Sequence, residues 1–218
     1  MSGRRPTLEG SAWARAAARL LLLGLTLALL AGCAGFGARP TAPAAPAGPE
    51  AHARHAEAVR ALERFRLAGR IGVQREDKGF SADLDWRELP PGYALRLAAP
   101  LSGGTYQLAD EGAGVVLAAP KGKNYRAADA EALMREHLGW SLPLDGARYW
   151  VRGVPDPARP VSGERLDEAG RWTDFAQDGW RVSVLEYAPA AGLDLPKRLF
   201  LSRDKLSVRM AIKTWERR

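Results

Sequence analysis

An alternation of apolar and polar residues with a period of two begins at Phe65 and constrains the fold more than any other feature of this chain. Apolar residues occupy every second position in most of 65–73, and the pattern resumes at 80–86 after the polar segment 75–79. This period places successive side chains on opposite faces of a strand. The two stretches are therefore expected to be half-buried strands joined as a hairpin.

The same pattern recurs along the chain, separated by residues that favour turns. Leu89 to Gly92 contains two prolines, and Asp178-Gly179 separates two later stretches. Short strands at this spacing are typical of an antiparallel sheet that curls toward a sandwich or a barrel. The last two strands are expected to form a hairpin whose outer face carries Arg209 and Lys213. The further predicted strands are 93–97, 105–108, 114–118, 172–177, 180–187, 197–202 and 205–215.

Helical patterns interrupt these strands. Apolar residues recur at spacings of three and four in 49–65, which predicts one amphipathic helix. A second helix is expected at 129–138, because it opens on an Asp suited to the N-cap and is followed by Gly139. A short helix is expected at 145–152, before a loop rich in Pro and Gly. The expected fold is therefore mainly β, with a helical insertion that covers one open face of the sheet.

The first 33 residues have the parts of a secretory signal. Four arginines and one acid precede the apolar run Leu20–Leu30, which is too short to span a bilayer, since spanning takes roughly 20 apolar residues. Leu30-Ala-Gly-Cys33 resembles the bacterial lipobox, which implies removal of 1–32 and acylation of Cys33. The residue after Cys33 is Ala34, whereas the inner-membrane retention signal has Asp at this position. The lipobox resemblance therefore implies that the protein is anchored at the periplasmic face of the outer membrane. A secreted protein with a chance cysteine and an uncleaved anchor helix remain alternatives.

The remaining chain is expected to consist of a flexible linker, 33–48, rich in Pro and Ala, and a single domain, 49–218. The formal net charge is +7, and without the surplus of three positive charges in 1–32 about +4 remains. A mildly basic balance is not typical of a nucleic-acid-binding protein. Cys33 is the single cysteine, so no disulfide can form within the chain. A monomer is expected.

No group of residues predicts catalysis. Of the three histidines, His52 and His55 lie three apart, but they form no recognisable metal motif and are expected on a solvated helix face. Asp83 and Asp85 share one face of a strand, where carboxylates usually serve solubility. Phosphate-binding loops, nucleophile elbows and zinc-protease motifs are missing from the sequence. The chain is therefore expected to be neither an enzyme nor a holder of a metal or cofactor.

Two apolar features are unusual. Leu101 follows Pro100 and precedes Ser102-Gly-Gly, in a loop where polar residues are expected, and it either folds back into the core or serves a function at the surface. The seven tryptophans are many for a chain of 218 residues. Large aromatic residues in a small β domain usually belong to the core.

An ordered series of motifs over about 65–215 resembles the LolB family. This resemblance implies an unclosed antiparallel β-barrel with an α-helical lid over an apolar cavity. It also implies an outer-membrane receptor that accepts acylated lipoproteins from the periplasmic carrier LolA and inserts them into the outer membrane. Ser102 departs from the Gly expected after Pro-Leu. The motifs are Leu67-Ala-Gly-Arg-Ile-Gly-Val73, Phe80-Ser-Ala-x-Leu-x-Trp86, Tyr93-x-Leu-x-Leu97, Pro100-Leu101, Tyr125, Asp129-Ala-Glu131, Leu138-Gly-Trp-x-x-Pro143, Tyr149-Trp-Val-x-Gly-x-Pro155, Gly179-Trp180 and Trp215.

The resemblance also implies site residues and partners. Leu101 matches the family's protruding-loop leucine, which acts in membrane insertion, and the expected partners are a LolA-type carrier, acylated cargo and outer-membrane lipid. A structural or accessory envelope lipoprotein that uses the barrel as a scaffold is the alternative, and a periplasmic hydrolase is a third possibility. Strand parity, the lid and the tryptophan set give the acyl-chain cavity candidates, which are Ile71, Leu84, Trp86, Leu95, Leu97, Leu133, Met134 and Trp150.

Overall fold

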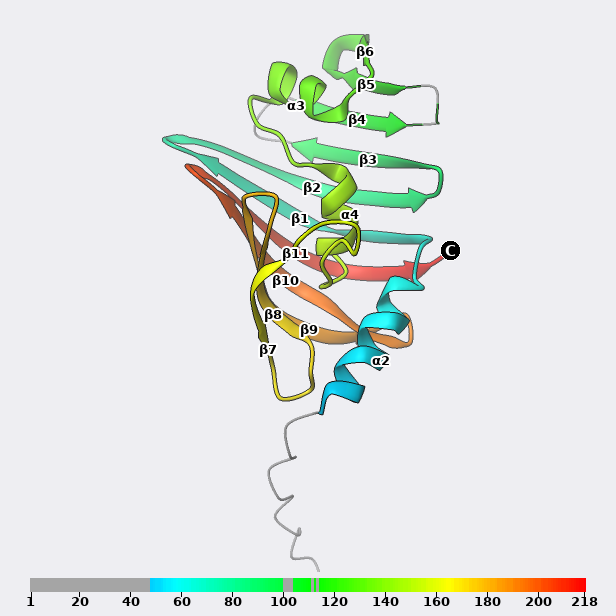
Figure 1. The fold of residues 1–218 in the computed structure, drawn as a ribbon. Coiled ribbons are helices and arrows are strands. Elements are labelled where there is room, and N and C mark those ends of the chain that lie inside the picture. Colours follow the sequence, from blue (N-terminus) through cyan, green and yellow to red (C-terminus); the bar gives the residue numbers. More distant parts are fainter. Residues whose placement is uncertain (1–47, 100–103, 111, 113) are drawn as a thin grey trace, which may run out of the picture. The chain divides into compact units, whose positions relative to one another are not determined.

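The computed structural model describes residues 48–218 except 100–103, 111 and 113 (Figure 1). These residues lie in one compact unit that spans 44–218 and has its own hydrophobic core. The predicted signal segment 1–32, the lipidation site Cys33 and the linker as far as residue 47 lie outside the described residues. Leu101 and Ser102 lie outside them as well.

Eleven strands form one antiparallel sheet that is not closed, as predicted. Its strand order is β6-β5-β4-β3-β2-β1-β11-β10-β9-β8-β7, so the first and last strands of the sequence pair at the centre. The two edge strands are β6 and β7. The bounds are β1 Phe65–Arg75, β2 Lys78–Leu89, β3 Gly92–Ala99, β4 Gly104–Asp110, β5 Val115–Ala119, β6 Lys123–Ala127, β7 Ser162–Leu166, β8 Trp172–Gln177, β9 Trp180–Ala190, β10 Leu193–Arg203 and β11 Leu206–Arg217.

The period of two seen in the sequence corresponds to burial on one face of the sheet. In β1 the buried side chains include Phe65, Leu67 and Ile71, whereas Arg70 between them is exposed. The same alternation holds in β2, and the register of β1 and β2 places Leu67 opposite Trp86. Because antiparallel partners point to the same face, these residues share one apolar surface.

The helical insertion crosses this apolar surface because of the strand order. The chain leaves one edge of the sheet at β6 and returns at β7 on the other edge, so residues 128–161 must connect opposite edges. They contain α3 (Ala130–Leu138) and α4 (Leu144–Trp150). Figure 1 shows α4 and the N-terminal helix α2 (Pro49–Arg60) on the same side of the curved sheet. The predicted covering of one open face is confirmed.

The capping predictions for α3 are confirmed. The side chain of Asp129 accepts hydrogen bonds from the backbone N–H groups of Glu131 and Ala132, at 2.9 and 3.2 Å. Gly139 ends the helix in the left-handed conformation, with φ of 79°. A residue without a Cβ adopts this conformation at little cost, which explains the stop at this position.

The predicted helix 49–65 is too long, since α2 ends at Arg60 and Phe65 begins β1. Phe65 fits both the helical spacing and the strand alternation, so periodicity alone could not assign it. The strands β6 and β7 were not predicted, and a short 3-10 helix, η2 (Pro120–Gly122), precedes β6. Every residue of β7 is exposed. An edge strand without a buried face has no alternating pattern to detect.

Candidate functional site

All eight residues predicted to line an apolar cavity are buried, and they belong to one hydrophobic cluster. Five come from β1, β2 and β3, two from α3 and one from α4. The fold therefore brings the predicted sheet positions and lid positions together. The lid and the sheet thus contribute side chains to one buried apolar cluster. The eight residues are Ile71, Leu84, Trp86, Leu95, Leu97, Leu133, Met134 and Trp150.

A buried carboxyl lies at the margin of this cluster. Glu88 on β2 is 4% exposed, and the indole Nε1 of Trp86 donates to its Oε2 at 3.1 Å. The guanidinium of Arg148 lies 3.7 Å from its Oε1. Burial raises the pKa of the Glu88 carboxyl above its ordinary value, although the Trp86 hydrogen bond, Arg148 and Arg152 act in the opposite direction.

Arg152, directly after α4, fixes the lid to the N-terminal helix. Its side chain is 3% exposed, and its Nη1 donates to three backbone carbonyls at the end of α2. Its Nε donates to the carbonyl of Arg148, at 2.9 Å. Burial lowers the pKa of Arg152 from its ordinary value. The carbonyl of Val59 also accepts from the backbone N–H of Leu62 at 3.1 Å, and Arg152 adds a side-chain donor to all three carbonyls of this helix end. They are those of Val59, Arg60 and Leu62, at 3.2, 3.2 and 2.9 Å.

Gln177, at the end of β8, fixes the other side of the same segment. Its Oε1 accepts from the indole Nε1 of Trp150 at 2.8 Å and from the backbone N–H of Asp156 at 3.0 Å. Its Nε2 donates to the carbonyls of Asp156 and Arg159, at 3.0 and 3.1 Å. The buried amide of Gln177 thus holds both α4 and the loop that follows it, because its oxygen accepts hydrogen bonds while its nitrogen donates them.

The helix α3 is attached mainly by apolar packing. Leu133 and Met134 are buried, and His137 stacks on Tyr125 of β6 with 3.7 Å between ring centroids. The guanidinium Nη1 of Arg75, at the end of β1, donates to the carbonyl of Gly139 at 2.8 Å. This contact is exposed to solvent, unlike the buried polar contacts of Arg152 and Gln177 around α4.

A hollow of about 300 Å³ opens beside the beginnings of α3 and α4, and its lining contains five carboxylates and the guanidinium groups of Arg159 and Arg203. Tyr93 lies in its wall together with Asp110, Asp129, Glu131 and Asp145. Burial raises the pKa of the Tyr93 hydroxyl, and the nearby Asp110 and Asp145 add to this effect. The hydroxyl therefore stays neutral. The hollow combines an acidic rim with the buried apolar cluster behind the lid.

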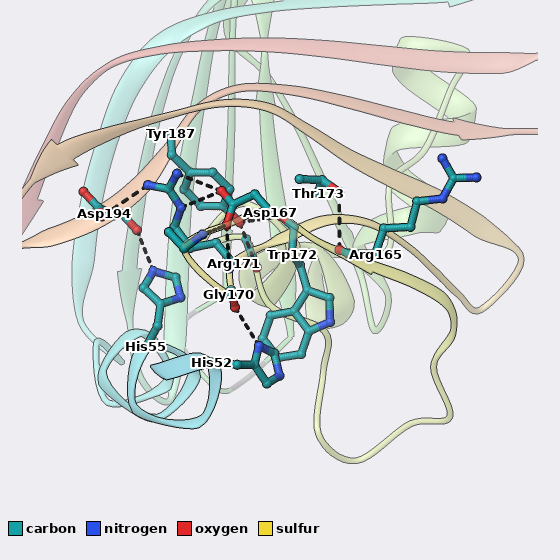
Figure 2. A network of polar contacts seen from close by, with 12 residues as sticks. His52, His55, Arg165, Asp167, Gly170, Arg171, Trp172, Thr173, Tyr187 and Asp194 are labelled. Carbon is teal, nitrogen blue, oxygen red and sulfur yellow. Dashed lines mark hydrogen bonds and ion pairs between the residues drawn. The ribbon is translucent and has the colours of Figure 1, made fainter. Parts of the chain in front are cut away.

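The prediction that His52 and His55 lie on a solvated helix face is wrong. Figure 2 shows the imidazole of His52 pointing at Gly170, between β7 and β8, and that of His55 pointing at Asp194, near the start of β10. His52 Nδ1 lies 2.7 Å from the carbonyl of Gly170, and His55 Nε2 lies 3.0 Å from that of Asp194. The N–H group of each ring donates to a carbonyl, so the histidines dock α2. Sequence spacing placed them on one face, but it could not show what that face contacts.

An ion-pair network supports this docking (Figure 2). Arg171 lies between two carboxylates, with Asp167 at 2.7 Å and Asp194 at 3.2 Å. Its guanidinium also stacks over the ring of Tyr187, 4.6 Å from the centroid. Hydrogen bonds from Arg171 hold the pKa of Asp167 below its ordinary value despite partial burial. Every contact in this network joins parts of the fold, so its role is structural.

The predicted carboxylate pair on β2 also has structural partners. Asp85 accepts hydrogen bonds from the guanidinium of Arg66, and Asp83 lies 3.5 Å from Arg70. The Arg66 hydrogen bond holds the pKa of Asp85 below its ordinary value. Among the residues that the structure describes, no three His, Cys, Asp or Glu side chains form a group suited to a metal ion.

Sequence reasoning missed Arg152 and Gln177. Arg152 lies in the run Trp150-Val-Arg-Gly-Val154, and a charged residue between apolar neighbours is a signal of a buried, partnered group. For Gln177 the sequence offers no comparable signal. Leu101 and Cys33 lie outside the described residues, so their predicted roles stay predictions. Within the described part of the chain, no helix is both long enough and apolar enough to cross a membrane.

Comparisons with known proteins agree with the sequence motifs. A family model described as outer membrane lipoprotein LolB matches residues 63–215. The chain is 38% identical over 192 residues to the outer-membrane lipoprotein LolB of Pseudomonas putida strain W619, covering 88% of this chain and 93% of that protein. The LolB of Nitrosococcus oceani is 32% identical over 198 residues, covering 91% and 97%.

A solved structure of a LolA superfamily protein from Nitrosomonas europaea superposes with a TM-score of 0.44 and 8% identity, covering 75% of this chain and 94% of that one. This likeness is too low to carry a functional argument.

Proposed function

The chain belongs to the LolB family of outer-membrane lipoproteins, and we propose that it accepts acylated lipoproteins from a LolA-type periplasmic carrier and inserts them into the outer membrane. The observation that carries this proposal is the single apolar cluster shared by the concave face of the sheet and the helices that cover it. A surface of this kind suits acyl chains when the covering helices move aside.

The energetics of acyl chains support this role. Each methylene that leaves water for an apolar site contributes about 0.8 kcal/mol, so exposed chains of a lipoprotein would be strongly destabilised in the periplasm. Transfer from carrier to receptor needs no nucleotide if the receptor binds the chains more tightly. Release then follows because the bilayer is the better apolar phase. The order of affinities gives the transfer its direction.

In this proposal the protein is itself a lipoprotein. Residues 1–32 direct export, Cys33 carries the acyl groups, 33–48 forms the linker and 49–218 binds cargo at the periplasmic face of the outer membrane. The chain acts as a monomer without a cofactor, a metal, a nucleic acid or an enzymatic step. These assignments rest on the lipobox resemblance and on the outer-membrane lipoproteins of the family.

Transfer of a radiolabelled lipoprotein from purified carrier to the unit 34–218 tests the acceptance step. The unit should take up the label and should also bind a fluorescent apolar probe in a stoichiometric amount, which lipoprotein then displaces. A scaffold lipoprotein, whose covering helices do not move aside, would take up neither ligand. Absence of both label and probe would therefore reject the proposal.

We assign the insertion step to Leu101 and test it by placing a charged side chain at this position. We expect Leu101→Glu to leave cargo acceptance intact and to block incorporation into membranes, because a carboxylate resists entry into the bilayer. Leu185→Glu is the matched control, since Leu185 on β9 is 64% exposed and is not expected to contact the membrane. Normal incorporation by the Leu101 variant would remove this residue from the mechanism.

A further inference from the structure

One end of the sheet carries basic side chains that the proposed function has not used. The turns β1–β2 and β10–β11 lie together there, since Arg75 pairs with Leu206 and the backbone N–H of Glu76 donates to the carbonyl of Lys205 at 3.4 Å. The end of β3 and the beginning of β4, Ala99 and Gly104, pair at the same end. Alternate turns of an antiparallel sheet necessarily share an end.

A hollow of about 400 Å³ lies at this end, between the two hairpin turns and the C-terminal end of α3. We call it the turn hollow. Trp140, Ser141 and Leu206 form part of its lining. Four basic and two acidic side chains complete the charged lining, so positive charge is in excess. These are Arg75, Arg135, Arg203, Lys205, Glu76 and Asp204.

Two guanidinium groups in the turn hollow are held in place by partners other than carboxylates. Arg203 stacks over the indole of Trp180, 4.8 Å from the ring centroid, and Arg75 donates to the carbonyl of Gly139. Neither forms an ion pair with a carboxylate of the described residues, whereas Lys205 pairs with Glu76 at 3.2 Å and Arg135 lies near Glu131 at 3.6 Å. Positioned guanidinium groups with spare N–H donors suit the oxygens of a phosphate group.

Further positive charge lies beside the neighbouring turn. A Cβ built on Gly104 would meet Pro120 at 2.8 Å, so the 3-10 helix η2 touches the beginning of β4. Lys121 in η2 and Lys123 at the start of β6 are both exposed, and neither forms an ion pair within the described residues. Basic side chains therefore lie at this end of the sheet on several of its strands and turns.

We propose that the turn hollow binds the phosphate of an anionic phospholipid headgroup, so that this end of the sheet faces the membrane. The inference rests on the proposed function, because an inserting receptor must present one end to the bilayer. Basic residues near an anionic membrane surface are attracted to it, and the Debye length limits this attraction to close approach. The guanidinium donors add a specific contact to this general attraction.

Vesicle binding tests the proposal. The unlipidated unit 34–218 is sedimented with phosphatidylcholine vesicles made with and without phosphatidylglycerol. We expect stronger binding to the anionic vesicles, and we expect R203Q/K205Q to lower it by about tenfold. The matched control R64Q/R217Q removes two exposed arginines that lie together at the opposite end, where β1 begins. The control should change binding less than twofold.

The possible results separate the proposal from its alternatives. An equal loss in both double variants would show attraction without a site and would overturn the proposal. Binding of inorganic phosphate is measured by the fluorescence of the tryptophans near the turn hollow. Saturable phosphate binding by a protein that does not bind vesicles would also overturn the proposal. Circular dichroism and thermal unfolding show whether each variant is folded.

The same samples are assayed for uptake of the apolar probe. A protein that takes up the probe but does not distinguish the two kinds of vesicle contradicts only the headgroup site. A wild-type protein that takes up no probe contradicts the proposed function, whatever its vesicle binding. The two proposals can therefore fail independently.

Discussion

Gly69 illustrates how one missing side chain determines the course of two strands. The register between β1 and β11 shifts after Ala68, where β11 contains one extra residue. A Cβ built on Gly69 would lie 2.1 Å from the carbonyl oxygen of Ala211 and 2.8 Å from the Cα of Ile212. Both obstacles are backbone atoms, so they cannot rotate away. The bulge at the centre of the sheet therefore requires glycine here.

Gly69→Ala should therefore lower the free energy of unfolding by about 2–4 kcal/mol, since the strands must separate or distort. Gly72→Ala is the matched control, because nothing lies within 4 Å of a Cβ at that position of the same strand. The control should be neutral or stabilising by about 0.5 kcal/mol. Urea unfolding followed by tryptophan fluorescence measures both. Equal effects would mean that the bulge tolerates a side chain.

The buried carboxyl of Glu88 predicts a dependence of stability on pH. Its pKa in the folded state lies above the ordinary value of 4.5, so the folded state binds more protons between the two values. The free energy of unfolding must then fall as the pH rises through this interval. In Glu88→Gln this loss is absent, and the variant should become more stable relative to the wild type with increasing pH above about 4.5.

Asp85 provides the comparison of opposite sign. Its pKa in the folded state lies below the ordinary value of 3.8, because Arg66 donates to it. Its stabilisation is present above that value and is lost as the pH falls through the lowered pKa. The loss of unfolding free energy in Asp85→Asn relative to the wild type should therefore become smaller at acid pH. Unfolding curves at several pH values give both trends, and parallel trends in the two variants would refute the assignments.

At the scale of elements, polar anchors divide the lid into two parts. The segment with α4 is held by the buried side chains of Arg152 and Gln177, whereas α3 has an exposed hydrogen bond from Arg75 and otherwise apolar contacts. Arg152 reaches from the α4 segment to the end of α2, Gln177 belongs to β8, and both side chains are buried. The helix α4 is therefore held by buried polar contacts to other elements, which α3 lacks among the described residues.

Arg152→Met tests the anchor between α4 and α2. The change keeps an apolar stem but removes the side-chain donor from three carbonyls at the end of α2, of which only that of Val59 retains a backbone donor, so we expect the free energy of unfolding to fall by about 3 kcal/mol. Faster amide hydrogen exchange should accompany it in α2 before it affects the central strands. Arg64→Met is the control, since the side chain of Arg64 is exposed and donates a hydrogen bond to the carbonyl of Pro90. Unchanged exchange in α2 would show that the histidine contacts alone dock this helix.

The elements also show where prediction from sequence stops. The strands with a buried face and the caps of α3 were predicted because alternation and capping residues are local signals. β7 was missed because all five of its residues are exposed, and β6 because its alternation consists of only two partly buried residues, Tyr125 and Ala127. The docking of His52 and His55 was wrongly predicted, since the carbonyls that they contact lie more than 100 residues away in the chain.

At the scale of the whole molecule, the length of the linker becomes a testable quantity. The 15 residues 34–48 span at most about 54 Å in any conformation. The helix α2 begins beside Gly170, at the end of the sheet opposite the turn hollow, and the 11 residues of β1 cover about 36 Å between these ends. A protein anchored at Cys33 that also turns the hollow toward the membrane needs most of this reach.

Deleting ten linker residues leaves a reach of about 18 Å, which is too short for that orientation. We expect the shortened lipoprotein to accept cargo from the carrier but to incorporate it into membranes more slowly. Replacing the same ten residues by Gly and Ser keeps the length and should preserve incorporation. Normal incorporation by the shortened protein would show that the turn hollow need not face the membrane.

The amino-acid sequence by itself determined the fold class, the buried face of the strands that alternate in hydrophobicity, the ends of α3 and the family. These properties depend on periodicity and on residue types at fixed spacing, which neighbours along the chain already specify. Only the tertiary structure decided which polar groups meet. Arg152 finds carbonyls about 90 residues earlier, and Gln177 meets Trp150 at a separation of 27. Such partners depend on the order of strands in the sheet, because burial removes water and leaves only those groups that the fold brings within hydrogen-bonding distance.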